Sequence, residues 1–157
     1  MGRLRKLREL TWGERCLLAS AFVLVASIRI ALWLFPFRTL RPALARLASN
    51  AAPRRYPLAK PVERVPWAVA VAAAYVPDAT CLVQALAGQI LFARYGEESK
   101  LHIGVAREER AGVRAHAWLD HGGRVVIGNS SLGDWTLEDF VPLFGLEEPE
   151  NPSRQYD

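Results

Sequence analysis

Cysteine is scarce in this sequence, and its scarcity excludes several classes of protein. The 157 residues include only two cysteines, Cys16 and Cys81, which lie far apart in different sequence contexts. Two isolated cysteines form neither a disulfide framework nor a CxxC metal-binding knuckle. We therefore expect a reducing, cytoplasmic environment and no metal centre. A chain of this length is sufficient for one domain whose core needs no disulfides.

Acidic residues are nearly absent from the first 60 positions. That part has 12 Lys+Arg against 2 Asp+Glu, a formal +10, whereas the remainder has 8 against 14, a formal −6, which together give +4. A basic half is typical of a docking face for an acidic partner or an anionic membrane. Arginines that only cover the solvent-exposed faces of helices would give the same pattern. No groove-reading motif is present, so nucleic acid is not expected. The candidate docking residues are Arg38, Arg41, Arg54 and Arg55.

The sequence also lacks an uninterrupted apolar run of membrane-spanning length. Residues 16–35 are long enough to cross a bilayer, but Arg29 interrupts them, and the apolar run before it has 13 residues. No convincing signal-peptide cleavage site follows. We therefore expect a soluble, apolar helix packed beneath the domain, with a second helix at 39–49. Peripheral membrane contact is the alternative.

Residues 51–66 contain several prolines and have no apolar periodicity, which is typical of a linker. The change of charge coincides with this segment. We therefore predict an N-terminal apolar helical region at 1–50, a Pro-rich linker at 51–66, an α+β core at 67–145 and a C-terminal tail at 146–157.

Within the core, the pattern predicts helices followed by strands. A helix is expected at 67–76, and a second helix starts at Asp78 or Thr80 and stops near Gly96. Three strands are then predicted, at 100–108, 113–120 and 124–129. The fold expected is a Cys-bearing helix packed on a small antiparallel sheet.

Cys81 falls in the first turn of the helix that stops near Gly96. The free N–H groups and the positive dipole end at that position favour the thiolate over the thiol and can receive an oxyanion. Cys81 is therefore a candidate nucleophile, although most free cysteines are small buried apolar residues, as Cys16 is expected to be. Gln84, on nearly the same helix face, is expected to be packed or solvated rather than a second oxyanion donor.

His116 lies inside the second predicted strand, which a Gly122-Gly123 turn connects to the third. Such a two-residue turn predicts that His121 pairs with Arg124. Counting outward from that pair places Trp118 opposite Ile127 and His116 opposite Asn129. Because opposed Cβ atoms are about 4.5 to 5.5 Å apart, we expect Asn129 to hydrogen-bond one imidazole nitrogen.

Asp120 is the competing third residue, since a carboxylate would stabilise an imidazolium better than an amide. It lies four residues beyond His116 on the same strand, about 13 Å away, which disfavours it. A bulge in the hairpin would instead bring Gly128 or Ser130 opposite His116. The choice between Asn129 and Asp120 stays open.

The order of Cys-bearing helix, strand, His-bearing strand and strand with a polar residue is that of a papain-like or transglutaminase-like cysteine enzyme. The segments CLVQALA, LHIGV and AHAWLDHGGRVVIGN, with the N-terminal helices, resemble the stand-alone B protein, the leader peptidase of lasso-peptide biosynthesis. The resemblance spans about residues 14 to 140.

The resemblance implies a cysteine peptidase without a cofactor, in which Cys81 is the nucleophile and His116 the base. Asn129 stands where the family has an aspartate. The implied partners are a precursor leader peptide, a separate leader-binding protein and a lasso cyclase. The alternative function is that of a non-catalytic transglutaminase-like adaptor, which binds a peptide or a membrane.

Overall fold

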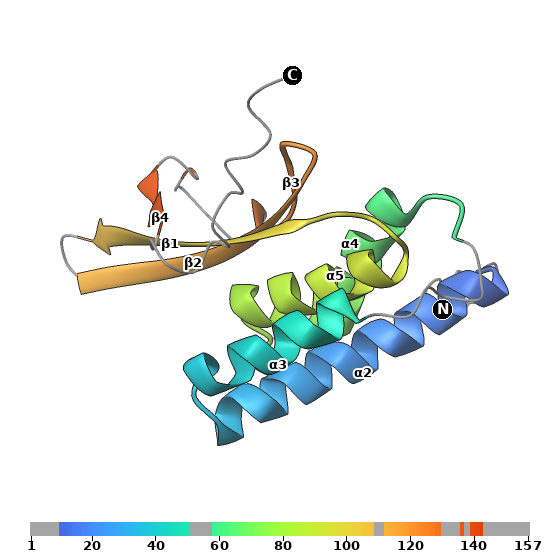
Figure 1. Ribbon diagram of the computed structural model, residues 1–157, viewed down its shortest axis with the longest axis horizontal. Helices are drawn as coiled ribbons and strands as arrows, with labels where there is room; N and C mark the ends of the chain where they lie inside the picture. Colours follow the sequence, from blue (N-terminus) through green and yellow to red (C-terminus); the bar gives the residue numbers. More distant parts are fainter. Residues whose placement is uncertain (1–9, 51–57, 109–111, 130–135, 137–138, 143–157) are drawn as a thin grey trace.

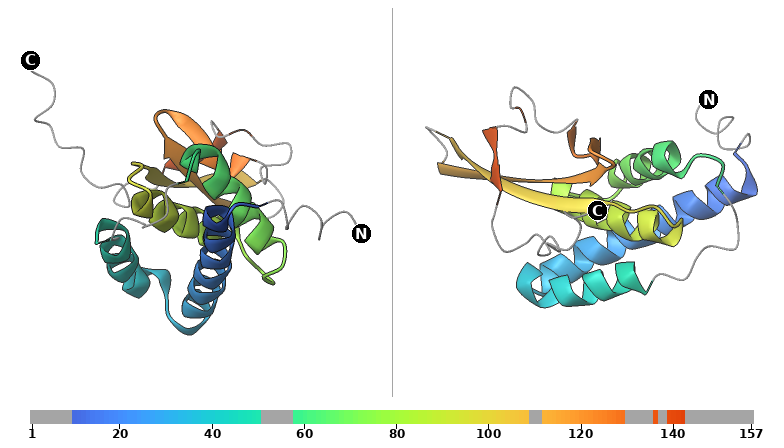
Figure 2. Two further views of the ribbon diagram at one scale, coloured as in Figure 1. Left: turned by 90° about the vertical axis from the view of Figure 1, so that its right-hand side faces the viewer. Right: turned by 45° about the horizontal axis from the view of Figure 1, so that its top comes forward.

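The computed structural model describes residues 10–50, 58–108, 112–129, 136 and 139–142, and the structural statements below concern these residues. The helices are α2 (Trp12–Leu34), α3 (Phe37–Ser49), α4 (Pro61–Ala73) and α5 (Cys81–Arg94). The strands are β1 (Lys100–Glu108), β2 (Gly112–His121), β3 (Arg124–Ile127) and β4 (Val141–Pro142). The helices gather on one side of the sheet, and α2 and α3 lie farthest from it (Figures 1 and 2). The expected α+β class is thus confirmed.

A capping box starts α2. The Thr11 N–H donates to Glu14 Oε2 at 2.8 Å, and the Glu14 N–H donates to Thr11 Oγ1 at 3.3 Å, so two otherwise free donors at the helix start are satisfied. The helix then places one apolar residue per turn against the core. These buried residues are Leu17, Ala21, Val25 and Ile28.

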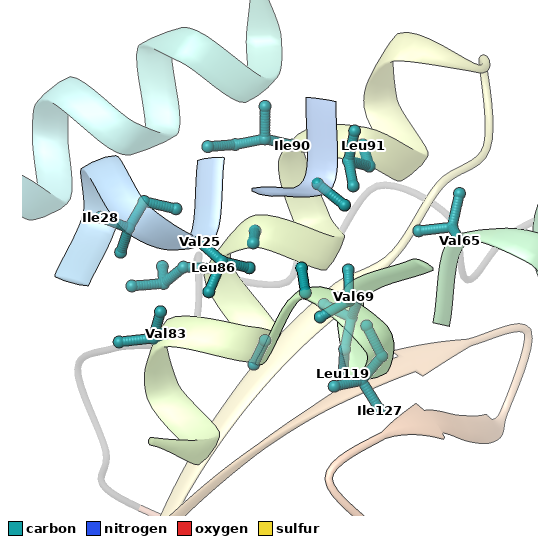
Figure 3. Close-up of a cluster of buried hydrophobic side chains, with 14 of the residues drawn as sticks. Val25, Ile28, Val65, Val69, Val83, Leu86, Ile90, Leu91, Leu119 and Ile127 are labelled. Carbon is teal, nitrogen blue, oxygen red and sulfur yellow. The ribbon is translucent and has the colours of Figure 1, made fainter. Parts of the chain in front are cut away.

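Gly88 allows α5 to lie close against the sheet. A Cβ atom at Gly88 would overlap Ile127 Cδ1 of β3 and lie 3.2 Å from Leu119 Cδ2 of β2. Leu119 and Ile127 are themselves buried in the core that α2, α4 and α5 share (Figure 3). The missing side chain therefore determines how closely the Cys-bearing helix approaches the strands.

The strands form an antiparallel sheet in the order β3-β2-β1-β4. Along the long β1–β2 pairing, His102 lies opposite Trp118 and Gly104 lies opposite His116. The predicted first strand has the bounds of β1, and the two strands of the glycine hairpin are observed with small differences at their ends.

The Pro-rich segment differs from the prediction. Residues 61–66 form the first part of α4. Pro61 is the first residue of this helix, where a backbone N–H would have no partner within the helix, so a proline is tolerated there. Val65 and Val69 then bury one face of this helix in the core shared with α2 and α5. The linker predicted at 51–66 is therefore wrong at its C-terminal end, and residues 51–57 lie outside the described chain. The N-terminal helices and the sheet share one hydrophobic core.

Candidate functional site

Cys81 is the first residue of α5, as the sequence predicts. Thr80 precedes it as an extended N-cap, with φ −62° and ψ 168°. The cysteine is partly exposed and packs against the edge of the core. The backbone N–H groups of this first helical turn have no partner within the helix.

The side chains of Arg29 and Gln84 bind to the turn that leads into Cys81. Asp78 has φ 54°, in the left-handed region, and Arg29 Nη2 of α2 lies 3.1 Å from its Oδ2. Gln84 Nε2 donates to the Ala79 carbonyl at 2.9 Å. The Gln84 amide is thus hydrogen-bonded within the turn, and its expected lack of an oxyanion role stays a prediction. The turn is therefore fixed from both α2 and α5.

His116 lies on the outer face of the sheet, away from α5. Ala117 and Leu119 of the same strand are buried in the core with α5, and consecutive side chains of a strand point to opposite faces. The buried His116 ring lies 6.1 Å from the Trp118 ring and 5.4 Å from the Phe140 ring, measured between centroids. The imidazole is thus embedded among aromatic side chains.

A main-chain carbonyl orients the imidazole of His116. Its Nε2 lies 2.8 Å from the Gly128 oxygen. Because a carbonyl oxygen only accepts, Nε2 is the protonated nitrogen, and Nδ1 of the neutral ring is the available base. The role of orienting the ring, which the sequence assigns to the Asn129 amide, is filled by the carbonyl of the preceding residue.

The predicted register of the hairpin is correct at the turn and wrong beyond it. His121 pairs with Arg124 and Asp120 with Val125, but Leu119, rather than Trp118, pairs with Ile127. This bulge adds one residue to β3 and shifts every later position by one. His116 therefore does not face Asn129, whose side chain is exposed.

Comparison with known proteins identifies the family of the chain. A family model described as the transglutaminase-like superfamily matches residues 22–144. The chain belongs to the transglutaminase-like superfamily. No curated protein and no solved structure gives a significant match. The match includes the positions of Cys81, His116 and Asn129, and it starts within α2, so the helical region belongs to the same unit as the sheet.

The described part of this transglutaminase-like domain contains no hydrogen bond between Cys81 and His116. Both residues occupy the elements that the sequence assigns to them, but their side chains do not pair. Asp120 accepts a hydrogen bond from the Gly123 N–H at 3.0 Å and so caps the hairpin turn. The catalytic roles of Cys81, His116 and Asn129 remain predictions.

The sequence analysis missed the aromatic cluster around His116. His102 stacks on Trp118, with ring centroids 5.5 Å apart and an interplanar angle of 11°. A Cβ atom at Gly104 would lie 2.7 Å from Phe140 Cβ and 3.0 Å from the Trp118 ring, so the glycine makes room for both. Alternation of His102 and Gly104 with the apolar residues of β1 is the signal that could have revealed this second face.

The described residues include no group of three or more His, Cys, Asp or Glu placed to hold a metal ion. The chemistry that the arrangement offers is that of a thiol at a helix N-terminus and of an imidazole with one fixed nitrogen.

Proposed function

We propose that this protein is a cysteine peptidase that removes the leader from a ribosomally made lasso-peptide precursor. It acts with a separate leader-binding protein and a lasso cyclase. The observation that carries the proposal is the position of Cys81 as the first residue of α5 in a chain of the transglutaminase-like superfamily. This superfamily includes cysteine proteases.

The proposed reaction begins with attack of the Cys81 thiolate on the scissile carbonyl carbon of the precursor. The free N–H groups at the start of α5 stabilise the resulting oxyanion. The C–N bond then breaks, and the leaving amine takes a proton from the His116 imidazolium. Water, activated by the neutral imidazole, attacks the thioester and releases the acyl group, which restores the thiol.

The Gly128 carbonyl supports the role of His116 as a base. It holds the proton on Nε2 and so leaves Nδ1 as the nitrogen that can accept a proton. Asn129, the third residue that the sequence predicts, directly follows Gly128, but the Gly128 carbonyl is the group that orients the ring. The proposed chemistry requires a conformation of the free protein in which Nδ1 and the thiol come within hydrogen-bonding distance, and substrate binding retains that conformation.

One observation favours a second candidate function, that of a non-catalytic peptide-binding adaptor. The His116 ring packs with Trp118 and Phe140 on the outer face of the sheet, whereas Cys81 packs against the core around α5. An adaptor needs no contact between the two. In that case Cys81 would be an ordinary thiol, and His116 a structural residue of the aromatic cluster.

Alkylation of Cys81 by iodoacetamide distinguishes the two functions. A Cys16→Ala background leaves Cys81 as the single thiol. The peptidase predicts rapid modification at neutral pH that slows several-fold in His116→Ala, because the imidazolium no longer stabilises the thiolate. His121→Ala is the matched control, since His121 lies on the same strand and bonds the Glu98 carbonyl. A slow rate that His116→Ala leaves unchanged would support the adaptor.

A further inference from the structure

The outer face of α2 carries several large apolar side chains that are exposed. They are 52% to 75% exposed, and Val23, Ile30 and Leu34 follow one another at helical spacing. A patch of this kind is uncommon on a monomeric soluble protein and marks an interaction surface. Its members are Trp12, Val23, Ile30, Trp33 and Leu34, together with Phe35 directly after the helix, here called the α2 patch.

The opposite face of α2 is buried in the protein core. Leu17 and Val25 are fully buried there, against α4 and α5. Length and composition alone would let α2 cross a membrane, a criterion that core helices and signal sequences also meet. Because a spanning helix would have to withdraw its core face, the α2 patch is suited to lie along a surface instead.

The charge of the two N-terminal helices favours an anionic surface. Within residues 10–50 the sole acidic residue is Glu14, which is buried and caps α2. Arg15, Arg38 and Arg46 are exposed on α2 and α3. Arg29, which interrupts the apolar sequence, is paired with Asp78 and so is neutralised within the protein.

Tryptophans lie near both ends of the α2 patch. Trp12 and Trp33 are separated by 21 positions, which corresponds to about 32 Å along a helix. Tryptophan is enriched at the interface between lipid headgroups and acyl chains. A helix that lies flat in that interface keeps both indoles at one depth, with the arginines beside the headgroups.

We propose that the α2 patch docks on an anionic lipid bilayer, with α2 lying in the plane of the interface. The apolar side chains enter the boundary between headgroups and acyl chains, and the arginines of α2 and α3 contact anionic headgroups. This inference does not depend on the proposed peptidase activity. It concerns a helix face that points away from the sheet on which His116 lies.

Flotation with lipid vesicles tests this proposal on the full chain. Vesicles contain either phosphatidylcholine alone or phosphatidylcholine and phosphatidylglycerol in equal parts. The wild-type chain is expected to float with the anionic vesicles and to remain largely free of the neutral ones. The triple variant Val23→Ser/Ile30→Ser/Trp33→Ser should lose most of this binding. Val113→Ser, which alters an equally exposed residue of β2, is the matched control and should bind like wild type.

A charge variant separates the electrostatic contribution to vesicle binding from the contribution of the apolar side chains. Arg38→Glu/Arg46→Glu should weaken flotation several-fold while leaving the circular-dichroism melting curve unchanged, because both residues are exposed. Failure of the wild-type chain to float with anionic vesicles would overturn the proposal, as would equal binding by the triple variant. A dimer that dissociates in the triple variant, without vesicle binding, would assign the α2 patch to a second copy of the chain.

Discussion

Arg29 of α2 is paired with Asp78, three residues before Cys81, with 3.1 Å between Nη2 and Oδ2. The pair joins positions 49 residues apart in the sequence and connects the most N-terminal described helix to the turn that presents the thiol. Asp78 has φ 54°, a conformation that Asp and Asn tolerate better than other residues with a Cβ atom.

Substitutions at Asp78 are expected to separate charge from backbone conformation. Asp78→Asn should lower the free energy of unfolding by at most about 1 kcal/mol, because the ion pair is exposed and the left-handed conformation is still tolerated. Asp78→Ala should cost more, since alanine tolerates that conformation poorly. Urea unfolding monitored by tryptophan fluorescence measures both. Equal losses for the two variants would show that the left-handed conformation of residue 78 does not affect stability.

Gly104→Ala should destabilise the outer face of the sheet. The new Cβ would meet Phe140 Cβ at 2.7 Å and the Trp118 ring at 3.0 Å, and a Cβ atom cannot rotate away. Overpacking of this kind costs about 1 to 3 kcal/mol. Thermal unfolding measures the loss. Gly96→Ala is an informative comparison, because nothing lies within 4 Å of a Cβ there and its cost arises from its φ of 76° alone.

The start of α2 predicts a dependence of stability on pH. The backbone N–H of Thr11 holds the pKa of Glu14 below its ordinary value, aided by the Thr11 hydroxyl and Arg64. The Glu14 carboxylate therefore contributes stability that is fully present above the unfolded pKa of about 4.3 and is lost as pH falls through the lower folded pKa. Glu14→Gln should flatten this part of the stability curve measured by urea unfolding. Glu63→Gln, at an exposed position on α4, should leave it unchanged.

Removal of the cap has a predicted cost of its own. Thr11→Ala should lower the free energy of unfolding by about 0.5 to 2 kcal/mol, because the Glu14 N–H loses its acceptor. Thr11→Ser keeps the hydroxyl and should retain most of the stability. If both variants unfold at the same urea concentration, the hydroxyl does not contribute to the cap.

The peptidase proposal predicts that Cys81→Ala and His116→Ala each abolish cleavage of a precursor bound to its leader-binding partner. Cys81 is partly exposed and small, so its replacement should leave the fold intact. His116 is buried beside Trp118 and Phe140 and needs a second variant, His116→Gln, which retains polar atoms in the same space. Mass spectrometry of the precursor reports cleavage. Wild-type turnover by either Cys81→Ala or His116→Gln would exclude the proposed roles.

Elements with a local signal were predictable from the sequence. Thr80 and Cys81 lie where a cap and a first helical turn were expected, because capping preferences act over a few residues. The capping box of Thr11 and Glu14 has the same local character. Pro61 misled the prediction, since proline is common both in linkers and at the first position of a helix.

The register beyond the hairpin turn was not predictable by counting. Val126 is the extra residue between the pairs Asp120–Val125 and Leu119–Ile127, and the sequence of the Gly122-Gly123 turn carries no signal for a bulge at that distance. Because of this one-residue shift in register, the group that contacts His116 is the Gly128 carbonyl rather than the Asn129 side chain. The outer-face cluster likewise requires Phe140, whose approach to Gly104 depends on tertiary structure.

The atom that orients His116 is a peptide oxygen, which every amino acid possesses. Truncation of side chains one at a time therefore leaves this contact in place, and a survey by alanine substitution would pass over it. What residue 128 does control is the path of the backbone, since its φ is 103° and a Cβ there would lie 2.8 Å from the Ala117 oxygen. Asn129, the next residue, is therefore not needed to align the ring. The tautomer of the imidazole stays fixed although position 129 has an amide rather than a carboxylate.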